Sequence, residues 1–164
     1  MPKTYEPIAT TTLGSANSTV TFSSIPATYT DLRVVVQYTA ASGTNNQMFI
    51  RFNSDTATNY SRTYLSGDGT TAGSGRQTSE TSAFITYAST NTQITIATID
   101  IMNYANTTTF KTVLTRSNNT TQTETRVLLW RKTPEAINRI DFGIYLSANF
   151  DTGSTFTLYG IKSA

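Results

Sequence analysis

The stretch NRIDFGIYL (138–146) decides the fold, because an apolar residue stands at every second position. Side chains alternate between the two faces of a β-strand, so this spacing predicts a strand with one apolar face. Four residues are expected to face inward: Ile140, Phe142, Ile144 and Leu146. Asp141 alternates with them and is expected to point to solvent.

The same alternation recurs along the chain. It is clearest in three further stretches: TVTF (19–22), DLRVVVQY (31–38) and QMFIRFN (47–53). Weaker patterns predict strands near 7–13, 60–65, 82–87, 93–102, 110–116, 124–131 and 154–162. Polar turns separate these runs, and no amphipathic helical period is visible. The fold class is therefore all-β: a single antiparallel β-sandwich or jelly roll of roughly 8–10 strands.

The length and composition fit one domain. The chain has 164 residues, of which 37% are hydrophobic and 13% charged, and it is rich in Thr. A β-branched hydroxyl residue suits the exposed face of a sheet. The prolines at positions 2 and 7 disfavour regular structure, so residues 1–7 are expected to form an N-terminal arm and residues 8–164 a single β-sandwich domain.

The composition argues against several functions. The chain has no Cys and no His, so thiol, imidazole and most zinc chemistry is absent. Most carboxylates fall at predicted turns; Asp100 and Asp141 lie within strands, and no nucleophile and base can be paired. We expect no enzyme, no catalytic residue, no cofactor and no metal site.

Charge and hydropathy limit the partners. Twelve basic and ten acidic residues leave a net charge of +2 without a basic cluster, so no nucleic-acid partner is expected. No apolar stretch is long enough to span a membrane. The segment MPKTYEPIATTTL (1–13) lacks a signal-peptide core, so no Sec export is expected.

Two irregularities bear on the fold. QITIATIDIM (93–102) changes phase between Ile96 and Ile99, which predicts a bulge or a bend between sheets. The Gly- and Ser-rich segment 66–79 is expected to be a long loop and a candidate for contacts.

Two strands carry apolar residues on both faces, namely TRVLLWR (125–131) and TFTLYGI (155–161). A central strand between two packed layers, or a change of phase at Gly160, would explain this. The alternative is an apolar face buried against another subunit. Together with the N-terminal arm, this reasoning nominates eight interface residues: Pro2, Lys3, Tyr5, Leu128, Trp130, Arg131, Tyr159 and Ile161.

The tyrosines leave sugar binding open. Tyr60, Tyr64 and Tyr104 could stack on pyranose rings, with exposed Tyr and Asn gathered around residues 60–75 and 103–109. Packing across a sheet is the competing explanation for these aromatic residues.

Four stretches resemble small β-sandwich virion proteins of tailed bacteriophages: SIPATYTDLRVVV (24–36), FNSDTATNYSRTYL (52–65), NYANTTTFKTVLTR (103–116) and GSTFTLYGIK (153–162). For a chain of this length, the resemblance implies a capsid decoration (cement) protein of jelly-roll type, typically trimeric. Its partners would be its own copies and the major capsid protein. It would be assembled in the host cytoplasm and located on the capsid exterior. The resemblance brings no catalytic motif.

The leading functional hypothesis is therefore a cement protein that stabilises the icosahedral shell by binding only the assembled form. The alternative is a glycan- or host-binding module of a tail fibre or capsid surface. A glycan-degrading enzyme is the third hypothesis, and it would need two facing carboxylates.

Overall fold

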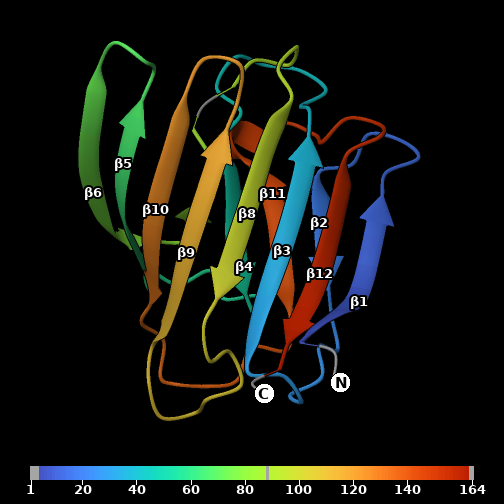
Figure 1. Cartoon of the computed structure of the whole chain (residues 1–164), viewed down its shortest axis with the longest axis vertical. Helices are drawn as coiled ribbons and strands as arrows, with labels where there is room; N and C mark the ends of the chain where they lie inside the picture. The colour runs from blue at the N-terminus through green and yellow to red at the C-terminus, as the bar shows by residue number, and fades with distance from the viewer. Residues whose placement is uncertain (1–3, 88, 163–164) are drawn as a thin grey trace.

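The computed structural model describes residues 4–87 and 89–162, which form an all-β sandwich of two antiparallel sheets (Figure 1). The larger sheet has the order β1–β12–β3–β8–β9–β10–β5–β6 and the smaller one β2–β11–β4–β7. The strands of the larger sheet are β1 (Tyr5–Thr12), β3 (Asp31–Tyr38), β5 (Tyr60–Gly67), β6 (Ala72–Glu80), β8 (Thr95–Ile101), β9 (Lys111–Asn118), β10 (Thr123–Trp130) and β12 (Thr155–Ile161). Those of the smaller sheet are β2 (Thr19–Phe22), β4 (Met48–Phe52), β7 (Ala83–Phe84) and β11 (Ile140–Ile144). The described residues contain no helix that is long and apolar enough to cross a membrane.

The core lies between the sheets and is built from the alternating apolar residues. In β11, Ile140, Phe142 and Ile144 are buried as predicted. Leu146 is 74% exposed, contrary to prediction, because the chain leaves β11 in a single 3-10 turn (Tyr145–Ser147). Asp141 does not point freely into solvent either: it accepts hydrogen bonds from Thr21 and Arg139 and is nearly buried.

Segment 66–79 is not the long loop expected from its composition. Most of it forms β6, which pairs with β5 as an antiparallel hairpin at the edge of the larger sheet. Glycine and serine weaken a strand but do not prevent pairing, and β6 is exposed along most of its length.

The predicted bulge in 93–102 is also absent. β8 pairs with β3 in unbroken register, and Ala97, Ile99 and Ile101 face the core. Ile94 and Ile96 are simply exposed. The apparent change of phase thus marks apolar residues on the solvent side of the strand.

The N-terminal boundary needs a correction. Residues 5–7 begin β1, which pairs with β12 and has a bulge after Pro7. Proline is tolerated there because β1 is an edge strand. Pro2 and Lys3 lie outside the described residues.

β12 keeps one register with β3 from Thr155 to Ile161, so no change of phase occurs at Gly160. Gly160 faces inward, where the ring of Tyr29 takes the place of a side chain; a Cβ there would lie 2.4 Å from Tyr29 Cδ1. Phe156 and Leu158 fill the core on the same side. Among residues 4–87 and 89–162, no second layer covers the opposite face of β12 (Figure 1).

Candidate functional site

The structure divides the proposed interface residues into two groups. Leu128 and Trp130 are buried in the core, with 1% and 2% of their surface exposed, and are not available to a partner. This part of the interface prediction is corrected: the apolar side chains of β10 that face away from the core are Val127 and Leu129. Arg131 is exposed at the end of β10, and β9, β8 and β3 separate it from β12.

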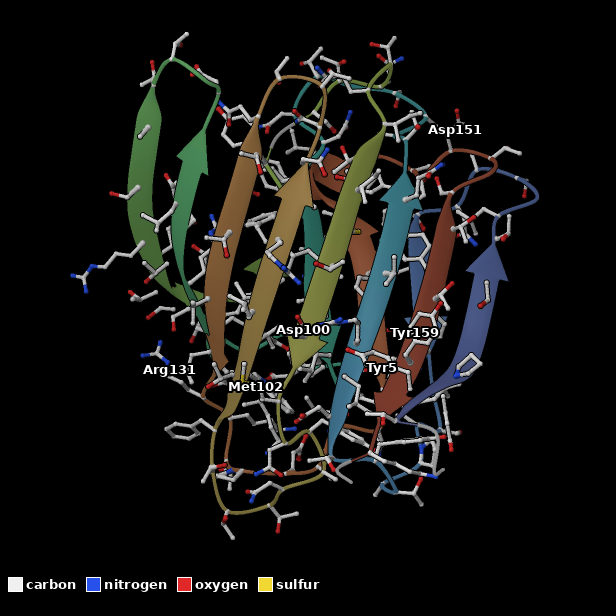
Figure 2. The ribbon with its side chains drawn as sticks, viewed as in Figure 1. Tyr5, Asp100, Met102, Arg131, Asp151 and Tyr159 are labelled. Atoms are coloured by element: carbon white, nitrogen blue, oxygen red, sulfur yellow. The ribbon has the colours of Figure 1, made fainter. Side chains whose placement is uncertain are left out.

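Tyr5, Tyr159 and Ile161 do lie together on the outer side of the larger sheet. Tyr5 pairs with Ile161 across the strands, and the rings of Tyr5 and Tyr159 meet edge to face at 6.5 Å (Figure 2). The guanidinium of Arg33 lies 5.5 Å from the centre of the Tyr5 ring and 2.5 Å from Asp100. These residues occupy the end of β12 that is near the N-terminus.

We call the solvent-facing side of the larger sheet the outward face. Four of its strands each present an exposed aliphatic residue on it: Val35, Leu65, Ile96 and Val127. Threonines occupy the outward face of β1 and β12, where the Thr10 hydroxyl group is hydrogen-bonded to that of Thr157 and the Thr12 hydroxyl group to that of Thr155. The outward face is thus broad and rich in aliphatic and hydroxyl groups.

A polar pocket of about 330 Å³ lies on the opposite, inner side of the same sheet. The β5–β6 hairpin extends beyond β4, β11 and β2 of the smaller sheet (Figure 1), so the inner side of the hairpin is only partly covered. The pocket is lined by Asn45, Gln47, Arg62, Tyr64, Gln77, Tyr87 and Arg126. We call it the hairpin pocket.

Strand register brings these residues together. Arg62 stands opposite Gln77 of β6, while Tyr64 stands between Gly75 and Arg126. A Cβ on Gly75 would lie 2.7 Å from Tyr64 Oη, so the glycine leaves room for the phenol ring to lie across β6. Arg126 lies 5.5 Å from the centre of the Tyr64 ring.

Arg126 is held rigidly by a buried ion pair. Its Nε and Nη2 donate to the two carboxylate oxygens of Glu124, each at 2.9 Å. Its remaining donors reach the backbone oxygens of Phe84 and Thr86. Charge and hydrogen bonds at Arg126 are therefore satisfied by the fold itself.

Arg62 is buried without comparable partners. Its Nε and Nη1 make no hydrogen bond, although only 7% of the side chain is exposed. Glu80 Oε2 lies 4.0 Å from Nη1, beyond hydrogen-bond distance, and the guanidinium stacks 4.6 Å from the Phe84 ring centre. Burial, reinforced by the charge of Arg126, lowers the pKa of Arg62 to about 10. Buried guanidinium donors without partners are costly, so this residue stands out.

A second depression, of about 430 Å³, lies beside β7 and the 3-10 turn and is lined in part by Phe49, Arg51 and Tyr145. Arg51 stacks on Phe49 and its Nε donates to the backbone oxygen of Thr81. The hairpin pocket differs in having a buried arginine with unmatched donors.

The proposed tyrosine cluster is only partly present. Tyr60 and Tyr104 are buried, and their hydroxyl groups bond to the backbone oxygens of Asp55 and Pro26. Of the three nominated tyrosines, only Tyr64 lines the hairpin pocket. The other pocket residues were not nominated from the sequence, although Arg62 and Arg126 stand at inward positions of alternating strands, where a charge is unusual.

The described residues contain no group of three or more Asp, Glu, His or Cys side chains placed to hold a metal ion. The chemistry that the hairpin pocket offers is hydrogen-bond donation, aromatic contact and positive charge.

No family model and no curated protein sequence matches the chain. Among solved structures, a toad ovary galectin in complex with thio-digalactose is similar, at 9% identity and a TM-score of 0.41, over 87% of this chain and 99% of that one. The galectin LEC-6 of Caenorhabditis elegans is similar at 8% identity, over 91% and 94% of the two chains, with a TM-score of 0.36. A CBM35 from Cellvibrio japonicus Abf62 has 12% identity, 94% and 76% coverage, and a TM-score of 0.20. These likenesses concern the β-sandwich fold and carry no information about a ligand.

Proposed function

We propose that this protein is a non-enzymatic binding module whose hairpin pocket binds a saccharide. The observation that carries the proposal is the lining, which combines the tyrosines Tyr64 and Tyr87 with amide and guanidinium side chains. The apolar faces of a sugar ring pack on aromatic rings, while its hydroxyl groups need convergent polar partners. The pocket volume is at the lower end of the range for small-ligand sites, about 300–1,000 Å³, and suits one end of a glycan.

The test is a glycan panel followed by titration of the best binder. Tyr64→Ala is expected to weaken binding about tenfold or more, because it removes the aromatic surface over β6, and a loss of about 1.4 kcal/mol is a factor of ten. The matched control is Tyr159→Ser, on the outer side of the same sheet, which is expected to bind normally. If no glycan of a broad panel binds the unaltered protein, the proposal is wrong.

A second candidate function is that of a phage capsid decoration protein. The outward face is the surface that this role would use, because four strands of one sheet expose an aliphatic side chain there and the Tyr5 and Tyr159 rings lie together at its edge. The resemblance to phage virion proteins points the same way. In this proposal the Tyr5–Tyr159 end of the outward face contacts a second copy within a trimer, and the trimer binds the major capsid protein on the shell exterior. A glycan-binding module carried on a capsid or tail fibre would unite both candidates.

Two measurements test the decoration proposal. The purified protein should co-sediment with mature capsids stripped of accessory proteins and saturate at a fixed number of copies per shell. Tyr159→Ser should weaken trimer formation in sedimentation velocity while leaving the fold intact, since Tyr159 lies outside the core. Tyr64→Ala serves as the control that should assemble normally. If the unaltered protein is monomeric and does not co-sediment with capsids, this candidate is ruled out.

A further inference from the structure

We infer that the hairpin pocket selects a saccharide that carries a carboxylate, and that Arg62 is the residue that binds this carboxylate. The inference rests on the proposed function, because it names the class of saccharide for the same pocket. Its basis is a mismatch between Arg62 and Arg126, which lie on neighbouring strands and line one pocket.

The two arginines differ in how closely a carboxylate approaches their guanidinium groups. Glu124 neutralises Arg126 through two hydrogen bonds of 2.9 Å. Glu80, the nearest carboxylate paired with Arg62, stays 4.0 Å away and accepts no hydrogen bond from it. Desolvating an ion is costly unless it is paired and hydrogen-bonded, and the loose contact with Glu80 offsets this cost at Arg62 only in part.

The lining indicates which ligand would remove this cost. The described residues that line the pocket include two arginines and three neutral amides, but no carboxylate. Because Glu124 already neutralises Arg126, the charge that an acidic group would meet in this pocket is that of Arg62, and the carboxylates of Glu124 and Glu80 do not belong to the lining. The planar guanidinium presents donors in a fork that matches a carboxylate, and such charge-assisted bonds are about twice as strong as neutral ones.

The neighbouring groups favour an acidic sugar over a simple anion. Tyr64 and Tyr87 supply aromatic surface, and Asn45, Gln47 and Gln77 supply donors and acceptors for hydroxyl groups. A uronic acid residue would contact the aromatic rings, the amide side chains and the Arg62 guanidinium at once. A small carboxylate such as acetate would use only Arg62.

The test compares matched ligands by titration calorimetry at constant ionic strength. Uronic-acid oligosaccharides are compared with their methyl esters, with neutral oligosaccharides of the same linkage, with sulfated analogues and with acetate. We expect the uronate to bind at least tenfold more tightly than its ester, and acetate to bind far more weakly. Equal affinity for uronate, ester and neutral sugar would overturn the inference and leave the proposed function intact. Binding of sulfated sugars alone would overturn the assignment to a carboxylate, and a failure of every sugar would remove the proposed function as well.

Arg62→Met separates ligand binding from folding. Methionine has a similar length and can still pack on Phe84, so the variant is expected to keep or raise the melting temperature, because a buried charge whose donors lack hydrogen bonds is gone. It should lose the tenfold preference for the uronate while still binding the neutral sugar. Arg62→Lys keeps the charge but not the planar fork, so its preference for the uronate should lie between that of the unaltered protein and that of Arg62→Met. A marked drop in melting temperature for Arg62→Met would show that the residue is structural and would contradict the inference.

Discussion

Trp130→Ala is expected to lower the free energy of unfolding by about 3–5 kcal/mol and to leave any self-association of the folded protein unchanged. Trp130 packs against Phe52 and Tyr60, with ring centres 5.4 and 6.4 Å away, and the three rings form one cluster. Its indole N–H donates to Asp55 Oδ2 at 2.7 Å. Truncation leaves a large cavity at the junction of the two sheets and takes a donor from a carboxylate, so packing and hydrogen bonding are lost together.

Urea unfolding followed by fluorescence of the Tyr residues or by circular dichroism measures this effect. The matched control is Val127→Ala, three residues earlier on the same strand but on the outward face, where a change within about 0.5 kcal/mol is expected. The opposite pattern, with Trp130→Ala dissociating an oligomer at unchanged stability, would restore Trp130 as an interface residue.

Trp130→Phe removes the hydrogen bond to Asp55 together with part of the ring volume, and the pH dependence of stability separates the two effects. Burial by itself would raise the pKa of Asp55, but hydrogen bonds from Asn59, Trp130 and the Ala57 backbone outweigh it and hold the pKa below its ordinary value. A lowered carboxyl pKa stabilises the fold above the unfolded-state pKa and loses that contribution as pH falls through the folded-state value. The stability difference between Trp130→Phe and the unaltered protein should therefore be largest at neutral pH and shrink in acid.

Alternating hydrophobicity predicted most of the fold. The strands at 19–22, 31–38 and 47–53 present the expected residues to the core, and the all-β sandwich class is confirmed. The prediction was wrong where a strand carries apolar residues on its exposed face as well as on its buried face. Ile94 and Ile96 look like a bulge only if every isoleucine is assumed to be buried, and segment 66–79 looks like a loop because composition alone does not show that β5 is available for pairing.

The hairpin pocket was harder to predict because it depends on strand order. Arg62 and Arg126 are 64 positions apart, and only the pairing of β5 with β10 makes them neighbours. The available signal was local: ETRVLLW (124–130) places Glu124 and Arg126 on the same side as Leu128 and Trp130. Charged residues that share the buried face of a strand indicate either a buried ion pair or a site, and here the Glu124–Arg126 ion pair borders the hairpin pocket.

Glu124→Ala is expected to cost about 3–5 kcal/mol, because it strips a buried arginine of its counter-ion. Glu124 and Arg126 side chains are 1% and 4% exposed, so water cannot readily replace the lost carboxylate. Ser117 Oγ, which donates to Glu124 at 3.2 Å, would lose its partner as well. The backbone oxygens of Phe84 and Thr86 would keep hydrogen bonds to Arg126 but do not neutralise its charge.

A double-mutant cycle shows whether charge is the cause. Arg126→Met in the Glu124→Leu background replaces the ion pair by apolar groups of similar size, and this double variant should be more stable than Glu124→Leu alone, since removing both members of a buried pair costs less than removing one; Arg126→Met alone completes the cycle. Glu124→Gln keeps an acceptor oxygen, so its free energy of unfolding should lie between those of the unaltered protein and Glu124→Ala. If Glu124→Ala costs less than about 1 kcal/mol, Arg126 does not need the carboxylate. Arg126 would then resemble Arg62, whose counter-ion accepts no hydrogen bond from it, and the contrast between the two arginines, on which the preference for an acidic saccharide rests, would disappear.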